Sequence, residues 1–290
     1  MNRRSALLGA AMQCSVEEES MPNAVVTEAA VPSHSKRFMW LTPDRVLYVG
    51  MLGMPAVRTM GSVTVYMAEQ GTMRVRINGG AWQTGSMAVV QPYVPHQVAT
   101  DAQLVHVLKI EAETVDPSAL PYPLAACGAV GELAFVQHVR DIVREMRGKG
   151  RDLNLNSLDF DTLFFGAPLA LRSMDRRIQD VIDGIKRDPS VMAAAQNCAQ
   201  SVHLSFSRFL HLFKEDVGVP FRSFRTWKRA RSLLHYVNRN ANLAHVALDI
   251  GYPDSTHFSH SIRQIYGLRP KDIFAGSRRL AIYEPVQHAT

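Results

Sequence analysis

The chain has 290 residues, of which 47% are apolar, 20% charged and 8% aromatic. This composition excludes a disordered, collagen-like or disulfide-scaffold protein and is typical of a soluble globular protein. The length suggests two domains. Residues 174–290 carry 17 Lys and Arg against 10 Asp and Glu, a net charge of +7, whereas residues 1–173 carry 15 against 16. The basic charge therefore belongs to the C-terminal part, which favours a polyanionic partner there.

The cysteines and the N-terminal residues indicate the cellular compartment in which the protein is expected. Cys14, Cys127 and Cys198 are far apart and lack the Cys-x-x-Cys or Cys/His spacing of a zinc site, which favours a reducing compartment. No apolar run reaches the roughly 18 residues that a membrane helix needs. The apolar stretch 5–12 imitates a signal peptide, but it is short and runs into three glutamates. We expect residues 1–24 to be a disordered extension of a cytoplasmic protein, with secretion as the alternative.

Residues 25–125 have the pattern of short strands separated by turns. The stretches 61–67 and 72–77 alternate with period two, and Asn78-Gly79-Gly80 then gives a turn signal. Two more strands are predicted over 85–91 and 104–111. Many short strands at this spacing indicate a barrel or a sandwich.

Residues 126–173 contain an amphipathic helix followed by a partly helical connector. The helix has one apolar stripe and an opposite polar face, and it is expected to stop at Gly148. Such a stripe is core in many proteins, but its place between two domains makes self-association an equal alternative. The stripe consists of Leu133, Val136, Val139, Ile142, Val143 and Met146.

A duplicated unit follows in the C-terminal part, after a helix that begins at Asp175. Ala199 precedes His203 by four residues, and Ala247 precedes Gly251 by four. A small residue lets two helices cross closely, and the later position needs a left-handed turn. Glycine suits that turn, and histidine is among the residues that tolerate positive φ. Each copy thus predicts a helix-turn-helix.

The second helix of each copy leaves one face free. Apolar i,i+4 pairs anchor these helices, namely Phe209 with Phe213 and Phe258 with Ile262. The free faces carry hydrogen-bonding side chains that suit base edges and phosphates. They are Ser207, Arg208 and His211 in the first copy and Ser255, Thr256 and His260 in the second. The alternative without a function is that these are solvated faces of two core helices. The duplication of the unit favours nucleic-acid contact instead.

A basic helix is predicted between the two copies. Its apolar residues can pack inward, and its cations are Arg222, Arg225, Lys228, Arg229 and Arg231. Such a run is often only a solvated face. Because this one joins two groove-reading helices, we expect some of these cations, Arg225 and Arg229 foremost, to contact phosphates.

Residues 175–273 resemble the DNA-binding domain of AraC/XylS-type transcription regulators. The resemblance rests on the run from Phe209 to Phe221, on Trp227 with Arg229, on the run from Ala247 to Ser259 and on Tyr266-Gly-Leu-x-Pro270. It implies seven helices, with two recognition helices in successive major-groove segments of DNA. The base-edge candidates transferred by position are Ser207, Arg208, Leu210, His211, Ser255, Thr256 and His260. The chain departs from the family where His211 and His260 replace a common arginine and His203 replaces a common glycine.

The resemblance also implies an α+β protein with a cupin-like β-barrel at 25–125, a helical dimerisation segment at 126–173, a double helix-turn-helix domain at 174–276 and a tail at 277–290. It implies a homodimeric regulator, an activator by family habit, that binds promoter DNA, a small effector and RNA polymerase. Side chains expected in the effector pocket are Tyr66, Arg74, Arg76, Trp82 and His96. Equally, Arg74 and Arg76 fit the solvent face of a strand.

Two other functions remain as alternatives. A cupin-type enzyme needs three converging metal ligands, and His96 and His106 are an incomplete set. No metal, cofactor or catalysis is therefore expected. A DNA-binding protein without effector remains open, whereas a nonspecific nucleoid-type binder would lack a reason for two helix-turn-helix units.

Overall fold

The strands come from the N-terminal half of the chain, with one exception at the C-terminal end. The computed structural model describes residues 36–149, 155–190 and 194–284, so the extension predicted at 1–24 lies outside the described residues. The described strands are β1 Phe38–Leu41, β2 Arg45–Gly50, β3 Ser62–Ala68, β4 Met73–Ile77, β5 Trp82–Gly85, β6 Met87–Val90, β7 His96–Ala99, β8 Val105–Glu111, β9 Gly128–Val130 and β10 Ala281–Tyr283. The strands predicted over 61–67, 72–77, 85–91 and 104–111 correspond to β3, β4, β6 and β8.

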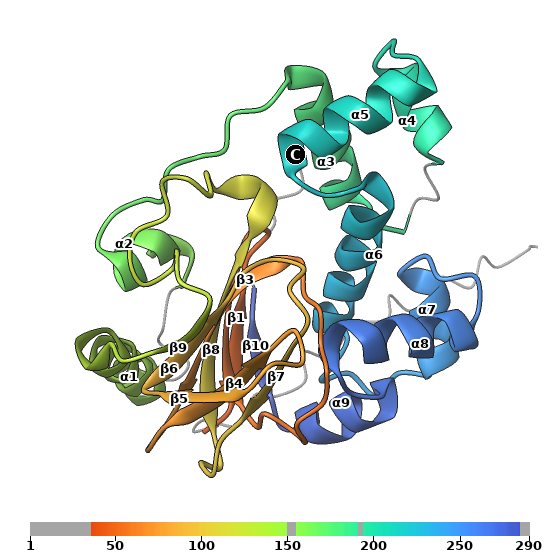
Figure 1. Ribbon diagram of the computed structural model, residues 1–290. Helices are drawn as coiled ribbons and strands as arrows, with labels where there is room; N and C mark the ends of the chain where they lie inside the picture. The colour runs from red at the N-terminus through yellow and green to blue at the C-terminus, as the bar shows by residue number, and fades with distance from the viewer. Residues whose placement is uncertain (1–35, 150–154, 191–193, 285–290) are drawn as a thin grey trace, which may run out of the picture. The chain divides into compact units, whose positions relative to one another are not determined.

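These strands form two sheets rather than one closed barrel. The larger sheet has the order β10-β1-β2-β8-β3-β6-β9, and the smaller one has the order β5-β4-β7 (Figure 1). All pairs are antiparallel apart from β1 with β10. Asn78 and Gly79 both have positive φ in the turn between β4 and β5, as the turn signal predicts.

The C-terminal end of the chain takes part in the larger sheet. Residues Ala281–Tyr283 form β10, which pairs in parallel with β1, so that Phe38 lies opposite Ala281. In Figure 1 the blue end of the chain lies beside the red first strand. The segment 277–290 therefore includes an edge strand, and it is not only a tail.

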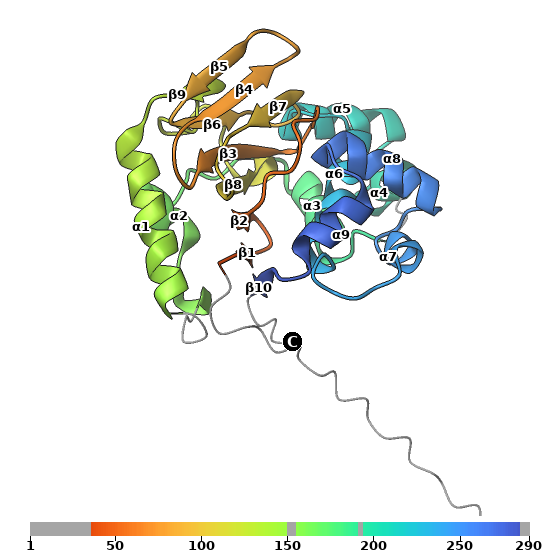
Figure 2. The same cartoon turned by 90° about the horizontal axis from the view of Figure 1, so that it is seen from below.

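Two helices, α1 (Leu133–Lys149) and α2 (Phe160–Phe165), lie on the opposite side of the sheets from the C-terminal helices (Figures 1 and 2). The amphipathic helix predicted within residues 126–173 is thus confirmed. Five residues of its apolar stripe are buried within the chain, and Leu133 alone of the six is exposed, at 70%. These five side chains belong to the core of a single chain, which corrects their assignment to a dimer interface.

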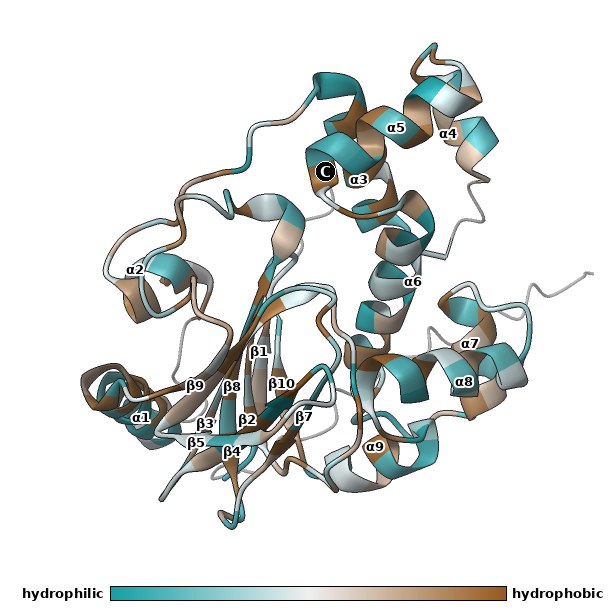
Figure 3. Cartoon of the chain, in the orientation of Figure 1, coloured by the Kyte–Doolittle hydropathy of each residue, from teal (hydrophilic) through white to brown (hydrophobic). Residues whose placement is uncertain are grey.

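Seven α-helices occupy the described C-terminal part, as the family resemblance implies. They are α3 Arg176–Arg187, α4 Ala195–Ser201, α5 Phe206–Val217, α6 Phe221–Ser232, α7 Leu243–Asp249, α8 Ser255–Tyr266 and α9 Pro270–Ser277. Short 3₁₀ turns lie at Ala112–Thr114, Leu155–Ser157 and Leu233–His235. Figure 3 shows alternating polar and apolar colour along these helices, as expected for helices packed by one face.

The two helix-turn-helix units are attached to the rest of the chain in different ways. The first unit has its own core, in which Phe209, Phe213 and Phe224 pack against α3. The second unit shares one core with the larger sheet, since Phe258 and Ile262 belong to the same cluster as Met39 and Val107. Helix α6 connects both, because Phe224 lies in the first core and Trp227 in the second.

Candidate nucleic-acid interface

The turn of the first unit, between α4 and α5, has the expected geometry. Ala199 is buried at 1% exposure, and His203 has φ of 55°, the left-handed conformation predicted for it. The backbone N–H of Leu204 donates to the Ala199 carbonyl at 2.9 Å, which closes the turn. Ser205 then caps α5 by accepting from the backbone N–H of Arg208. The non-glycine residue is thus accommodated at a strain of about 1 kcal/mol.

The second turn, between α7 and α8, requires glycine for two reasons. Gly251 has φ of 84°, and a Cβ there would lie 2.6 Å from the Ser190 carbonyl oxygen. The Asp254 carboxylate caps α8 by accepting from the backbone N–H groups of Thr256 and His257, each at 2.8 Å. These hydrogen bonds hold the pKa of Asp254 below its usual range. The first turn of α8 is therefore held in place before any ligand arrives.

The base-edge candidates lie on accessible faces of α5 and α8. Leu210 is half-buried, whereas the other six are exposed: Ser207, Arg208, His211, Ser255, Thr256 and His260. Helices α5 and α8 run in similar directions, and Figure 1 shows them at opposite ends of α6. Two exposed polar helices in this relation suit contacts in successive segments of a major groove.

Phe206 is an exposed residue of α5 that the sequence reasoning missed. It stands at the first position of the helix, beside Ser207, and is 49% exposed. An apolar side chain at this place can contact a thymine methyl group. The signal in the sequence was that Phe206 falls outside the apolar pair Phe209 and Phe213.

Helix α6 divides its cations between two environments. Arg222 is exposed, and Arg225 and Arg229 are half-buried. Nε of Arg229 has no hydrogen-bond partner among the described residues. Burial lowers the pKa of both half-buried arginines, and the charge of Arg229 lowers that of Arg225 further. Lys228 and Arg231 are buried instead, so these two are not available to phosphates.

The two buried cations meet carboxylates from the end of β8. Arg231 Nε donates to Glu111 Oε1 at 2.8 Å, and Lys228 pairs with both Glu111 and Glu113. Trp227 Nε1 donates to Glu111 Oε2 at 2.7 Å. Burial raises the pKa of Glu111, but the opposing charges of Lys228 and Arg231 outweigh burial and bring that pKa to about 2. This carboxylate cluster joins α6 to the larger sheet.

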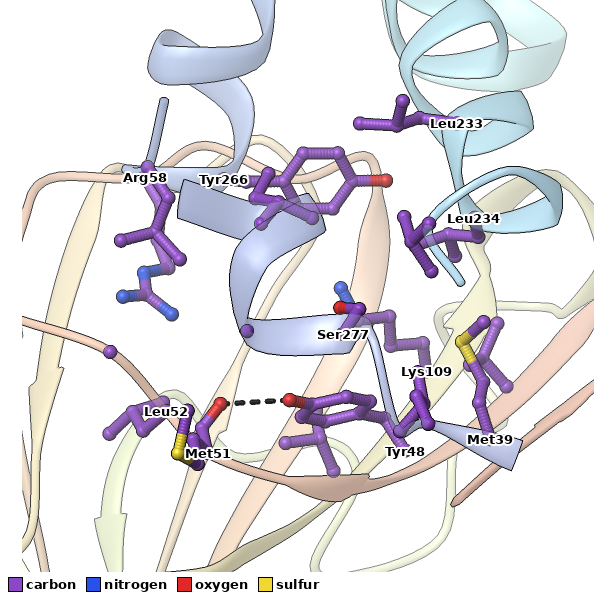
Figure 4. Close-up of a pocket in the computed structure, with 18 of the residues that line it drawn as sticks. Met39, Tyr48, Met51, Leu52, Arg58, Lys109, Leu233, Leu234, Tyr266 and Ser277 are labelled. Atoms are coloured by element: carbon purple, nitrogen blue, oxygen red, sulfur yellow. Dashed lines mark hydrogen bonds between the residues drawn. The ribbon is translucent and has the colours of Figure 1, made fainter. Parts of the chain in front are cut away.

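An apolar cavity of about 160 Å³ lies between the larger sheet and the helices α8 and α9 (Figure 4). Of the predicted pocket residues, Tyr66 lines it. His96 lies behind Tyr66, with its Nε2 2.9 Å from the phenol oxygen. Arg74, Arg76 and Trp82 do not line the cavity.

Those three residues belong to β4 and β5 of the smaller sheet. Arg74 and Trp82 are exposed, and Arg76 donates to the carbonyls of Gly79 and Gly80 in the adjoining turn. They therefore lie outside this cavity, and their assignment to an effector pocket stays a prediction. The strand alternation explains the result, because Met73 and Val75 occupy the inward positions of β4.

Two cations of the cavity, Lys109 and Arg58, were missed from the sequence. Lys109 follows Val105 and Val107 on the same face of β8, where a charge interrupts an apolar alternation. That interruption was the available signal. Arg58 gave no such signal, because it lies in the loop before β3 and only an isolated bridge to His96 holds it there.

Two other kinds of site are absent from residues 36–149, 155–190 and 194–284. No group of three or more His, Cys, Asp or Glu side chains in these ranges has an arrangement able to hold a metal ion. No helix within them is long and apolar enough to cross a membrane.

Part of the C-terminal helical region is similar to known proteins. A family model described as a helix-turn-helix domain matches residues 198–276. The invasion protein InvF of Salmonella typhi is 31% identical over 71 residues, which are 24% of this chain and 33% of InvF. InvF of Salmonella typhimurium matches to the same extent. The match therefore spans about a third of the length of these relatives.

Solved structures extend the likeness to both halves of the chain. An apo ToxT variant from Vibrio cholerae is 12% identical, with a TM-score of 0.50, over 80% of this chain and 97% of that one. A second ToxT structure from Vibrio cholerae is 10% identical, with a TM-score of 0.51, over 80% and 96%. At such identities the likeness concerns the fold, an N-terminal β-sheet part followed by a helical part. The family model and the geometry of the two turns together show a helix-turn-helix domain at residues 198–276, in a chain whose fold is similar to that of ToxT.

Proposed function

We propose that this chain is a sequence-specific DNA-binding transcription regulator that places α5 and α8 in successive major-groove segments of one promoter site. The carrying observation is the pair of capped, exposed recognition helices joined by α6. The proposed base contacts come from Ser207, Arg208, Leu210, His211, Ser255, Thr256 and His260, and the proposed phosphate contacts come from Arg225 and Arg229. The net charge of +7 in residues 174–290 also supports the proposal, because a basic domain attracts the phosphates of DNA.

The finer aspects of the proposal come from the family. We infer an activator that works as a homodimer in the cytoplasm, contacts RNA polymerase and responds to a small effector. The described α1 stripe is buried, so a dimer has to use other surfaces. The effector would occupy the cavity between the sheet and α8, since that cavity borders the core of the second helix-turn-helix unit.

The test is a footprint of the full chain on the region upstream of its own gene, followed by titration of the protected duplex and a scrambled duplex of equal length. A regulator of this kind binds its site at least 10³-fold more tightly than the scrambled DNA. Equal affinity for both duplexes would instead indicate a nonspecific binder.

Variants assign the contacts to the two units. Arg208→Ala and His260→Ala should each weaken specific binding by about 1–3 kcal/mol and relax the base preference at different positions of the site. Arg144→Ala, an exposed arginine of α1, is the matched control and should leave binding unchanged. Loss of binding without any change in base preference would argue against direct readout by these helices.

A further inference from the structure

The two helix-turn-helix units differ in what holds them against the N-terminal part of the chain, residues 36–149. In Figure 1, α3 and α5 lie at one end of α6, and α8 lies at the other. The second unit is held by packing, since Phe258 shares a core with the larger sheet. The backbone N–H of Thr59 also donates to the Ile265 carbonyl, at 3.1 Å. The core of the first unit consists of residues between Met174 and Phe224, so other contacts have to fix its position.

Lys186, at the end of α3, makes such a contact. Its amine lies 2.6 Å from Asp44 Oδ1, in the turn between β1 and β2, and 3.5 Å from Glu113 Oε1, in the turn after β8. It donates a charge-assisted hydrogen bond to Asp44. Burial lowers the pKa of Lys186, but the charges of Glu113 and Asp44 outweigh burial and raise that pKa above its ordinary value. This lysine therefore ties the first unit to two turns of the larger sheet.

Glu113 joins the same lysine to α6. Its Oε1 also lies 2.5 Å from Lys228 Nζ, and the residue is 4% exposed. Neither amine points at Oε1 with hydrogen-bond geometry, so the attraction of opposite charges holds the three groups together. Lys228 pairs with Glu111 as well, and the cluster thus spans α3, α6 and the end of β8. Carboxylates of the N-terminal part hold both helices against which α5 packs.

We propose that Asp44 and Glu113 are positioning residues for DNA recognition. Acting through Lys186, they fix α3, and with it α5, at one distance from α8. One extra base pair between two segments of a major groove moves them apart by about 3.4 Å and turns them by about 35°. The N-terminal part thereby sets the number of base pairs between the two segments that the chain reads, without touching DNA. This inference rests on the proposed function.

The burial of these groups separates positioning from stability. Loss of Lys186 leaves both hydrophobic cores complete, and Glu113 keeps its pair with Lys228. The side chains of Lys186 and Asp44 are 19% and 39% exposed, and ion pairs with access to water contribute little to stability. A variant without this pair should therefore fold, with α5 able to take a range of positions relative to α8.

The first experiment measures the position of α5 without DNA. Spin labels on Ser207→Cys and Ser255→Cys report the distance between α5 and α8 in the full chain by double electron–electron resonance. The background carries Cys14→Ser and Cys127→Ser, and Cys198 is buried. The parent should give one narrow distribution of distances.

The variants Lys186→Met and Asp44→Asn should each broaden that distribution about twofold, because the first unit loses its attachment to the sheet. Glu69→Gln is the matched control. It breaks an ion pair of similar exposure, with Arg147, inside the N-terminal part, and it should leave the distribution unchanged.

The second experiment measures spacing on DNA. The protected duplex is compared with one that carries an inserted base pair between the segments assigned to α5 and α8 by Arg208→Ala and His260→Ala. The parent should lose about 100-fold in affinity on insertion, since the contacts of one unit are lost. Lys186→Met and Asp44→Asn should lose only about tenfold, because α5 can follow its displaced segment. Glu69→Gln should lose as much as the parent.

Several results would overturn the inference. They are equal insertion penalties in the parent and both variants, no penalty in the parent, or distance distributions that the variants leave unchanged. An equal loss of affinity on both duplexes would also overturn it and would assign Lys186 to a phosphate contact. If the chain does not prefer its site over scrambled DNA, the proposed function fails, and the spin-label distances still decide whether Asp44 and Lys186 hold α5 in place.

Discussion

Trp227 on α6 donates its indole N–H to the carboxylate of Glu111, 116 residues earlier in the chain, at 2.7 Å. Glu111 ends β8, the same strand that carries Lys109 into the cavity. Gly61 lies against this tryptophan, because a Cβ at Gly61 would be 2.4 Å from the indole. One strand therefore borders the cavity and holds the helix that joins the two helix-turn-helix units.

Removing the charge of Glu111 should destabilise the protein. Glu111→Gln removes the charged partner of Arg231 and one of the two carboxylate partners of Lys228. Because positive charge is then left uncompensated in the interior, the unfolding free energy should fall by about 3 kcal/mol. Urea denaturation at pH 7 measures this cost. Glu145→Gln, in an exposed pair with Lys149, is the control and should change stability by less than about 1 kcal/mol.

The sign of the pH dependence follows from the lowered pKa of Glu111. Its folded pKa of about 2 lies below the value of about 4.3 for an unfolded chain, so its contribution is complete above that value and is lost as the pH falls toward 2. The Glu111→Gln variant should therefore lose less stability than the parent between pH 5 and pH 3. Equal losses would show that the cluster does not act through this charge.

Acid should also weaken the fold through two buried histidines. Burial lowers the pKa of His96 and of His106 to about 4, and the charge of Arg147 lowers that of His106 further. The unfolded chain binds more protons between pH 6.5 and pH 4, so stability falls as the pH drops through that window, by the order of 3 kcal/mol for each histidine. His106→Leu should make the loss smaller, measured by urea midpoints at pH 8 and pH 5. The same loss in parent and variant would contradict the assignment.

Neutralising the cavity cation should stabilise the empty protein. Burial and the charge of Arg58 lower the pKa of Lys109 to about 7, far below its ordinary value. The unfolded chain then binds more protons above pH 7, so stability should rise with pH from 7 to about 10. Arg58, Glu111, Arg231 and the exposed Asp272 are the charged groups facing this amine.

Lys109→Met should raise the unfolding free energy at pH 7 by about 1 kcal/mol, because it replaces an unpaired buried cation by an apolar side chain of similar length. The variant should also lose the rise toward pH 10. Thermal unfolding of parent and variant without ligand measures both effects. Lys271→Met, at an exposed position, should remain within about 0.5 kcal/mol of the parent at pH 7. A less stable Lys109→Met protein would show that the amine has a partner in the folded state.

The separate cores predict local unfolding of the first helix-turn-helix unit. Phe213→Ala opens a cavity in a core that the sheet does not share, and it should cost that unit about 3–5 kcal/mol. Hydrogen exchange should accelerate in α4 and α5 and stay slow in β3 and β8. The matched variant Phe258→Ala lies in the shared core and should accelerate exchange in the sheet as well. If both variants accelerated hydrogen exchange in the sheet equally, the separation of the two cores would be contradicted.

Phosphate contact by α6 predicts a change in salt dependence. Arg229→Gln should reduce the slope of log K against log salt by up to about 0.9 on every duplex, since one fewer counterion is released. Arg225→Gln tests the other half-buried arginine in the same way, and Arg144→Gln on α1 serves as the control. Unchanged slopes in both α6 variants would refute the phosphate role of these arginines.

The amino-acid sequence by itself determined those features that depend on local spacing. The duplicated Ala199–His203 and Ala247–Gly251 pairs predicted both helix-turn-helix units, because a close crossing and a left-handed turn require those residue types four positions apart. Strict alternation located β3 and β8, and a 3.6-residue period located α1.

Only the tertiary structure decided which charged residues meet one another. The sequence does not distinguish Lys228 and Arg231 from the other cations of α6. The fold does, because it brings them against Glu111, which lies more than a hundred residues earlier in the chain. The same holds for β10, whose three residues carry no strand signal but complete the edge of a sheet. Long-range pairing of this kind depends on how the elements pack, which the periodicity of a single segment does not encode.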